Sequence, residues 1–213
     1  MLGSAFGGLH NGTFTATNVS LKQVLAAAYG RTEPRIAGPD WLDRDRFDIV
    51  AKSPPGVPDT QLQPMLQALL RGRFKLTAHP EMREMPVYYL SVARDGVKMS
   101  IFPALDQGPV HPGDDPGVRG FPMLRGTFTT AQLADTMARI VNRPVIDRTG
   151  LTERYNLFLS YAPIAPQGGD APEFGPPDFF TAIQKQLGLK LQSGKDAVEV
   201  IVVDHMEQTP TEN

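Results

Sequence analysis

The spacing of apolar residues along the chain predicts an alternation of short strands and amphipathic helices. Residues 46–52 place an apolar side chain at every second position, which is typical of a strand with one buried face. Residues 20–29 instead repeat apolar side chains at helical spacing, and Ser20 with Gln23 has the form of a capping box. A chain with both patterns is expected to have an α+β fold, in which helices pack on small sheets.

The second half of the chain repeats the pattern of the first half in the same order. The phrase GTFT occurs at Gly12–Thr15 and again at Gly126–Thr129, and an amphipathic helix follows in each copy. Further along, the phrase Arg46–Ile49 aligns with Arg154–Leu157. Similarity that runs through successive elements indicates an internal duplication of a β-α-β-β-α-β-β unit, with mostly antiparallel sheets.

Each copy is expected to end in two short strands joined by a turn. In the first copy the strands are predicted at 74–79 and 86–93, on either side of a charged turn at 80–85. In the second copy they are predicted at 189–191 and 198–203. Both copies would then close with a strand pair of their own.

Proline and glycine mark the expected domain boundaries. The first repeat unit is predicted at 12–102, a Pro/Gly linker at 103–124, and the second repeat unit at 125–207, with a long loop at 163–177. Residues 1–11 are small and Gly-rich, and they are expected to be poorly ordered.

Composition excludes several classes of function. The chain has 213 residues, of which 41% are hydrophobic, and its net charge of −2 gives no global field that would attract nucleic acid. The chain has no cysteine, which excludes disulfides, thiolate nucleophiles and thiolate metal sites. No apolar run approaches the roughly 18 residues that a membrane span needs. The expected partner is therefore a small molecule or a protein, with no nucleic acid and no membrane span.

Several phrases of the sequence carry a resemblance to a known family. The matching phrases are Val19–Leu21, Gly38–Leu42, Arg46–Ala51, Met65–Leu70, Arg73–Leu76, Arg143–Leu151, Gln186–Leu189, Asp204–Glu207 and the terminal Glu212-Asn213. Through them the sequence resembles the large soil-associated family of unknown function that is expanded in soil bacteria. The resemblance spans nearly the whole chain.

The resemblance implies little chemistry, because that family has no assigned activity. Its members usually begin with an export signal and an extra leading strand, so the resemblance implies a secreted, extracytoplasmic protein. Residues 1–12, MLGSAFGGLHNG, show neither feature, and the chain is expected to be a truncated or late-starting version. A weaker, topological resemblance is to the short N-terminal domain of secretins and TonB-dependent receptors, which recognises partner proteins.

Asp204, His205 and Glu207 are the candidate catalytic residues. They follow an apolar strand, and an Asp–His pair can orient an imidazole as a general base. Adjacent residues of a strand point to opposite faces, however, which argues against a direct pair between Asp204 and His205. The alternative is that the histidines are ordinary surface residues.

Two groups of aspartates are the candidate metal ligands. Asp40 and Asp43 lie in one turn, whereas Asp114 and Asp115 lie in the Pro/Gly linker. Calcium takes several oxygen ligands from such loops, so Ca²⁺ is the alternative to the expectation that no cofactor is required. Arginines interleave the first group, and local salt bridges are its favoured explanation.

Trp41, Arg46 and Arg154 are the candidate ligand-binding residues. Trp41 is the single tryptophan, and it lies in a Gly-Pro-Asp-Trp turn, where an aromatic ring can serve as a platform for a ligand. The favoured alternative is an aromatic plug that closes the end of a sheet.

Two functional hypotheses follow from these observations. The first is a non-catalytic binding or interaction module outside the cytoplasm, which the repeat and the receptor-domain resemblance favour. The second is a hydrolase of small esters or lactones, assisted by calcium or by a carboxylate–histidine pair near His205. No GxSxG or SxxK phrase supports a serine nucleophile, so the second hypothesis needs an enzyme without a known motif.

Overall fold

The computed structural model divides the chain into two compact units. Unit 1 consists of Met1–Met85 and Ala197–Asn213, and unit 2 consists of Pro86–Asp196. The structure describes residues 5–10, 12–52, 61–101, 121–163 and 175–211. The sequence instead predicts two contiguous repeat units joined by a linker. That division differs from the two compact units, and it stays a prediction.

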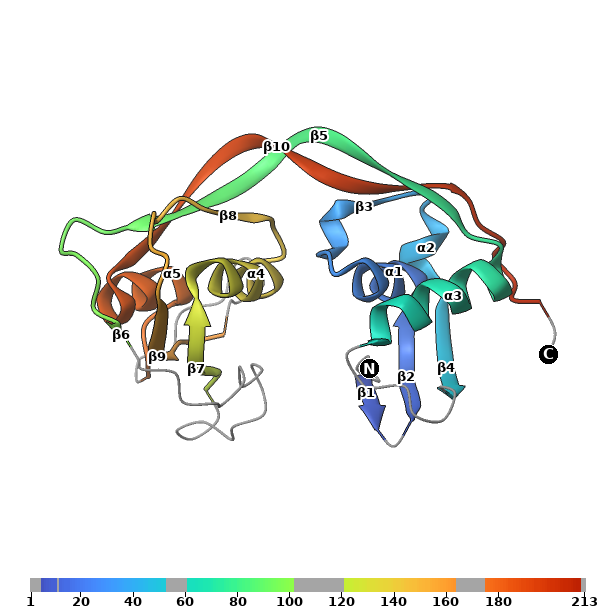
Figure 1. The fold of residues 1–213 in the computed structure, drawn as a ribbon, viewed down its shortest axis with the longest axis horizontal. Helices are drawn as coiled ribbons and strands as arrows, with labels where there is room; N and C mark the ends of the chain where they lie inside the picture. Colours follow the sequence, from blue (N-terminus) through green and yellow to red (C-terminus); the bar gives the residue numbers. More distant parts are fainter. Residues whose placement is uncertain (1–4, 11, 53–60, 102–120, 164–174, 212–213) are drawn as a thin grey trace. The chain divides into compact units, whose positions relative to one another are not determined.

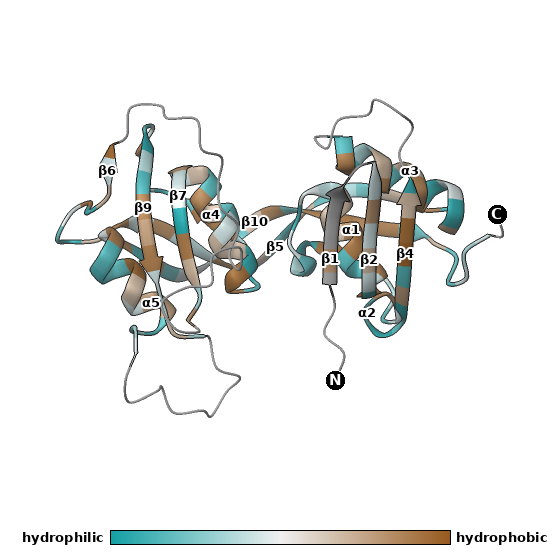
Figure 2. Cartoon of the chain, turned by 90° about the horizontal axis from the view of Figure 1, so that it is seen from below, coloured by the Kyte–Doolittle hydropathy of each residue, from teal (hydrophilic) through white to brown (hydrophobic). Residues whose placement is uncertain are grey.

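Unit 1 is built on an antiparallel sheet. Its strands are β1 (Ala5–His10), β2 (Thr13–Ser20) and β4 (Arg46–Lys52), in the order β1-β2-β4. Buried or half-buried residues alternate with exposed ones along β4, so one face of the sheet lies on the core, and much of the strand is hydrophobic in Figure 2.

Two helices of unit 1, α1 (Leu21–Tyr29) and α3 (Leu62–Phe74), pack against each other and against the apolar face of this sheet (Figure 1). Short turns of helix, η1 (Glu33–Arg35) and α2 (Trp41–Arg44), connect α1 to β4. The core of the unit contains the buried apolar residues Phe14, Leu25, Leu66 and Leu70.

Unit 2 has a second antiparallel sheet. Its strands are β6 (Ser100–Ile101), β7 (Met123–Thr129) and β9 (Arg154–Ser160), in the order β6-β9-β7. The helix α4 (Thr130–Ile140) follows β7 directly. The last helix of the unit begins as α5 (Phe179–Ala182) and continues as the π-helical segment η3 (Ile183–Leu187). The core of this unit contains Leu124, Met137, Leu159 and Phe179.

Two long strands run from one unit into the other. They are β5 (Thr77–Val92) and β10 (Leu189–His205), which lie side by side in a sheet of order β3-β10-β5-β8 (Figure 1). The predicted strand pairs at the end of each copy are therefore wrong, because each is one continuous strand. The segment 80–85 contains charged residues and Pro80 but no glycine or asparagine that would favour a tight turn.

Each unit takes its last strand from the other half of the sequence. The short strand β3 (Ile36–Ala37) pairs in parallel with the second half of β10, where Ile36 lies opposite Ile201. The short strand β8 (Val145–Asp147) pairs in parallel with the second half of β5, where Val145 lies opposite Tyr88. Neither half of the sequence thus contains all the strands of one unit.

The helices α1 and α4 begin in the same way. Ser20 caps α1 and Thr129 caps α4, each in a complete capping box. In the sheets, Ser20 lies opposite Arg46 and Thr129 lies opposite Arg154. The predicted match between Arg46–Ile49 and Arg154–Leu157 thus joins residues with the same structural place.

The two GTFT phrases do not share a structural place. Thr129, the last residue of the second phrase, caps α4, whereas Thr15, the last residue of the first phrase, lies inside β2 opposite Val50. A strand must stop where the next helix is capped. In the first copy the cap is Ser20, five residues after Thr15, so the strand continues beyond the GTFT phrase. Both units contain the succession strand, helix, short strand, strand and helix, but the duplication itself stays a prediction.

The N-terminal segment contains a strand that the sequence did not predict. β1 occupies residues 5–10 and pairs antiparallel with β2, so the expectation of poor order is wrong for these residues. Backbone hydrogen bonds to β2 hold this Gly-containing segment in place, although its side chains give no clear alternation. Across the described segments, no helix is long and apolar enough to cross a membrane. The chain has the predicted α+β fold.

Candidate functional site

Unit 1 contains a pocket of about 590 Å³ beside α3. One wall is α3 itself, and the other is formed by Phe14 of β2 and its cross-strand neighbour Ala51 of β4. Most of the lining is apolar. The described residues that line it are Phe14, Ala51, Lys52, Gln61, Leu62, Pro64, Met65, Leu66, Ala68, Leu69, Gly72 and Arg73.

The pocket exists because α3 carries more apolar residues than the core can cover. Leu66 and Leu70 are fully buried in the core of unit 1, whereas Leu62, Met65 and Leu69 are only half-buried. These three side chains face the pocket and stay in partial contact with solvent. An apolar stripe on a helix that is wider than its core contact leaves surface that a ligand can cover.

Two cations lie at this pocket. Lys52 is the exposed last residue of β4, and Arg73 is a half-buried residue in the last turn of α3. Nη1 of Arg73 donates a hydrogen bond to the carbonyl oxygen of Thr211 at 2.9 Å, which fixes the direction of the guanidinium. A guanidinium has five N–H groups, so four others remain after this bond.

The sequence predicted the α3 residues only as a helix core, and the pocket was missed. A signal was present, because the segment from Leu62 to Leu70 has apolar residues at positions that cover about half of the helix surface. The second wall could not be read from the sequence, since it depends on the pairing of β2 with β4.

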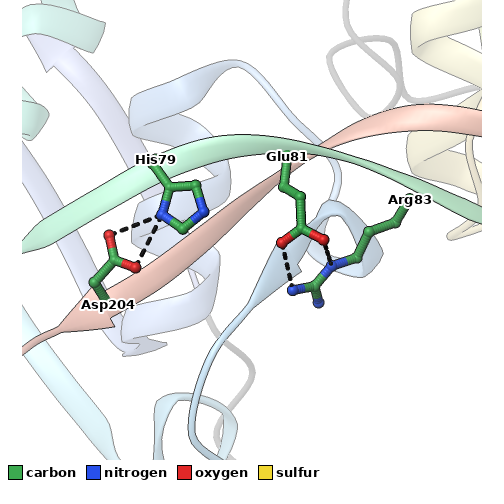
Figure 3. A network of polar contacts seen from close by, with 4 residues as sticks. All are labelled: His79, Glu81, Arg83 and Asp204. Carbon is green, nitrogen blue, oxygen red and sulfur yellow. Dashed lines mark hydrogen bonds and ion pairs between the residues drawn. The ribbon is translucent and has the colours of Figure 1, made fainter.

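A second group of polar side chains lies on the exposed parts of β5 and β10 (Figure 3). Nδ1 of His79 lies 2.9 Å from the carboxylate of Asp204, on the neighbouring strand. The side chain of His79 is 51% exposed and that of Asp204 is 43% exposed. Asp204 therefore contacts a histidine 125 residues away in sequence. The sequence had suggested the adjacent His205.

Glu81 and Arg83 form the other pair in Figure 3. They lie two residues apart on one face of β5, and Arg83 donates hydrogen bonds from Nε and Nη2 to the two carboxylate oxygens of Glu81 at 3.1 and 2.8 Å. The hydrogen bond from Arg83 holds the pKa of the Glu81 carboxyl below its ordinary value. Charges on an exposed strand of this kind discourage pairing with the strands of other molecules.

The other two candidate catalytic residues, His205 and Glu207, are not part of the His79–Asp204 contact. His205 is the exposed last residue of β10. Glu207 is exposed as well, and its backbone N–H donates to the carbonyl oxygen of Phe74 at 2.7 Å. A catalytic role for these residues stays a prediction.

The candidate ligand-binding residues lie in different places. Trp41 begins α2 and packs, half-buried, against the core of unit 1, which agrees with the aromatic-plug alternative. Arg46 begins β4 in unit 1 and Arg154 begins β9 in unit 2, and both are exposed. None of the three lines the pocket.

The candidate metal ligands are only partly described. Asp114 and Asp115 lie outside the described residues. The carboxylate of Asp43 accepts a hydrogen bond from Lys22 at 2.7 Å, and Asp40 directly precedes α2. In the parts of the chain that the structure describes, no group of three or more His, Cys, Asp or Glu residues could hold a metal ion. A calcium site stays a prediction.

Comparison with known proteins places the chain in a family without a described activity. No curated protein matches it, and no solved structure does. One family, described as a protein of unknown function, DUF3738, matches residues 22–206. The match includes all of unit 2, most of unit 1 and every described residue that lines the pocket except Phe14. The chain therefore belongs to this family of proteins of unknown function, DUF3738.

Proposed function

We propose that the protein is a binding module, which takes up a small, largely apolar molecule in the pocket beside α3. The observation that carries the proposal is the pocket itself, with its volume of about 590 Å³ and its mainly apolar lining. Pockets that bind small molecules have volumes of roughly 300–1,000 Å³ and combine an apolar lining with a few polar groups.

Burial of apolar surface supplies the driving force for this binding. Leu62, Met65 and Leu69 are half-buried in the free protein, so a ligand that covers them removes apolar surface from water. Each Å² of apolar surface removed from water contributes about 25 cal/mol. The walls are a helix and two paired strands, so little ordering of the protein opposes binding.

A bulky substitution at the pocket tests the proposal. Ala68 is an exposed residue of the lining, and a tryptophan at this position fills the pocket without disturbing the core. Arg71 is exposed on the same helix but does not line the pocket. We expect Ala68→Trp to abolish binding of the apolar dye 8-anilinonaphthalene-1-sulfonate, and Arg71→Trp to leave it unchanged.

The dye titration is followed by fluorescence and needs a folding control. Circular dichroism and the thermal midpoint must show that both variants keep the fold, since partly folded proteins also bind this dye. Equal dye binding by the wild type and both variants would exclude the pocket as the binding site. An absence of dye binding in the wild type, with no binding of dodecanol either, would argue against the proposal as a whole.

The His79–Asp204 contact supports a second candidate, a hydrolase of small esters or lactones. A carboxylate on Nδ1 of a histidine fixes the imidazole so that Nε2 can accept a proton. Calcium held by carboxylates such as those of Asp40 and Asp43 would assist the reaction in this candidate. A panel of esters and lactones, assayed with calcium and with chelator, tests it. Turnover that survives in His79→Gln, or no turnover at all, counts against it.

The location outside the cytoplasm that the family resemblance implies belongs to the same proposal. A binding module for small molecules needs contact with the medium that contains them. Fractionation of cells that express the natural full-length gene product, followed by immunodetection, tests this location.

A further inference from the structure

The shape of the pocket restricts its ligand. The lining residues on α3 and at its N-cap extend from Gln61 to Arg73 and come from every turn of the helix. An α-helix rises 1.5 Å per residue, so this wall is roughly 18 Å long. An apolar wall of this length fits a linear chain better than a compact ring system.

The charges at the pocket restrict the ligand further. Its described lining contains Lys52 and Arg73 and no aspartate or glutamate. The described lining is therefore basic, whereas the chain as a whole has 23 acidic and 21 basic residues. Arg73 keeps four N–H groups besides the one that binds Thr211, and a planar guanidinium matches the two oxygens of a carboxylate.

From the shape and the charges together, we infer that the pocket binds a linear amphiphile with an anionic head group, of the long-chain carboxylate class. The alkyl chain lies along α3, between Leu62, Met65 and Leu69 and the opposite wall. The carboxylate is held by Arg73 or Lys52 in a charge-assisted contact. This inference rests on the proposed binding function, because it names the ligand class of the same pocket.

Three probes with the same chain and different head groups separate the inference from the proposal on which it rests. The probes are dodecanoate, dodecanol and dodecyltrimethylammonium, each titrated into the full chain below its micelle concentration by calorimetry. We expect dodecanoate to bind about tenfold more tightly than dodecanol, because a charge-assisted hydrogen bond adds to the apolar contribution. We expect the cationic probe to bind most weakly.

Two methionine variants locate the head group. Lys52→Met and Arg73→Met keep the apolar stems of the side chains and remove their charges. At least one of them is expected to lower the affinity for dodecanoate to that for dodecanol, without changing the affinity for dodecanol. Arg71→Met is the matched control, since Arg71 is exposed on the same helix outside the pocket. Arg73 also donates a hydrogen bond to Thr211, so Arg73→Met can destabilise the fold. If it does, the affinities of Lys52→Met and of the three probes decide whether the ligand is anionic.

The outcomes distinguish the proposed binding function from the inferred ligand class. If none of the three probes binds, the proposed binding function is wrong. If all three bind with equal affinity, the binding function stands and the anionic ligand class is wrong. If the cationic probe binds most tightly, or if neither methionine variant changes the preference for dodecanoate, the inference is overturned.

Discussion

Units 1 and 2 share the succession strand, helix, short strand, strand and helix, and the caps of their first helices, but their last helices differ. In unit 1 the last helix, α3, is regular and has 13 residues, and it borders a pocket. In unit 2 the last helix consists of the four residues of α5 and the five-residue π-helical segment η3. Two units with a similar succession of elements can therefore differ in the length and the regularity of the last helix.

The ends of these two helices show the difference at the level of single residues. Both helices end at a residue in the left-handed conformation, Lys75 with φ of 52° and Gly188 with φ of 70°. A side-chain carbon at Gly188 would lie 1.9 Å from the carbonyl oxygen of Gly96. The helix end in unit 2 is thus packed against another backbone segment, whereas the Lys75 side chain is exposed and Nζ contacts the carbonyl oxygen of Gly72.

The strands that each unit receives from the other half of the sequence are also held differently. In unit 1, Glu199 of β10 accepts a hydrogen bond from Arg31 through its carboxylate, and its backbone carbonyl accepts one from Arg35. In unit 2, the ring of Tyr89 lies against Gly194, and its hydroxyl donates to the carbonyl oxygen of Lys195 at 2.7 Å. Unit 2 also has a charged contact, between Arg148 and Asp196 at 2.9 Å, so its distinguishing feature is the aromatic ring of Tyr89.

The largest effect is expected at the two helix ends. Gly188→Ala should lower the free energy of unfolding by about 3 kcal/mol or more, because the left-handed conformation and the close Gly96 carbonyl both oppose a side chain. The matched change in unit 1, Lys75→Gly, should raise it by about 1 kcal/mol. Urea unfolding followed by circular dichroism measures both. Similar effects at the two positions would contradict the difference described above.

Trp41 adds a second measurement to this experiment. It is the single tryptophan and packs against the core of unit 1, so its fluorescence reports on unit 1. If the exchanged strands couple the two units, Gly188→Ala should also lower the urea midpoint of the Trp41 signal. An unchanged Trp41 midpoint would show that the units unfold independently.

A smaller effect is expected at Gly194. A side-chain carbon there would lie 2.3 Å from the ring of Tyr89, so Gly194→Ala displaces the ring and should destabilise the protein by about 2 kcal/mol. In a Tyr89→Leu background the cost should fall, as a double-mutant cycle in urea unfolding would show. Gly72→Ala is the control in unit 1. It should stabilise α3 by roughly 0.5–1 kcal/mol, since nothing lies within 4 Å of the added carbon.

Removal of the two helix caps should destabilise the protein less than the two destabilising glycine substitutions do. Ser20→Ala and Thr129→Ala each remove the side-chain oxygen that accepts the backbone N–H of the third helical residue, at a cost of about 1 kcal/mol. Ser20 is only 2% exposed, so the N–H left behind there finds less water, and its replacement should cost more. Thermal unfolding measures the order of the two variants. Thr129→Ser, which keeps the oxygen, should stay close to the wild type, and a larger loss in Thr129→Ala than in Ser20→Ala would reverse the expectation.

The smallest effect is expected from the charged contact of unit 1. The hydrogen bond and the charge of Arg31 hold the pKa of Glu199 below its ordinary value of 4.5. A lowered folded-state pKa stabilises the protein above the unfolded-state pKa, and this contribution is lost as the pH falls through the folded-state value. Glu199→Gln should therefore lower the thermal midpoint slightly at pH 7, and the difference from the wild type should shrink below about pH 4.

The Arg31→Met variant controls for the charged partner. It should cause the same loss at pH 7 and add little to that of Glu199→Gln, because both substitutions remove one contact. A difference between wild type and Glu199→Gln that does not change with pH would show that the charge of Glu199 contributes nothing to stability.

The sequence predicted those features that depend on neighbouring residues. The capping box of Ser20 and Gln23 and the apolar spacing of α1 were recognised. The strand at 46–52 was recognised from alternation alone. Capping and periodicity are local, so a single sequence contains all the information that they need.

The features that were predicted wrongly, or that the sequence did not suggest, depend on distant partners. The segment 80–85 forms part of one long strand because β10 lies beside β5. The strand β1 exists because β2 offers it backbone hydrogen bonds. Asp204 contacts His79 rather than its neighbour His205, since strand pairing brings the first two together. No local pattern distinguishes these arrangements from a turn, a free end or a surface histidine.

The sequence by itself determined the α+β class, the capped amphipathic helix α1, the amphipathic helix that follows the second GTFT phrase, and the strand at 46–52. Only the tertiary structure decided that each unit receives its last strand from the other half of the chain, and that the apolar stripe of α3 borders a pocket. The physical reason is that backbone groups and apolar surfaces must find partners somewhere, but hydrogen bonding and burial do not specify how far along the chain these partners lie.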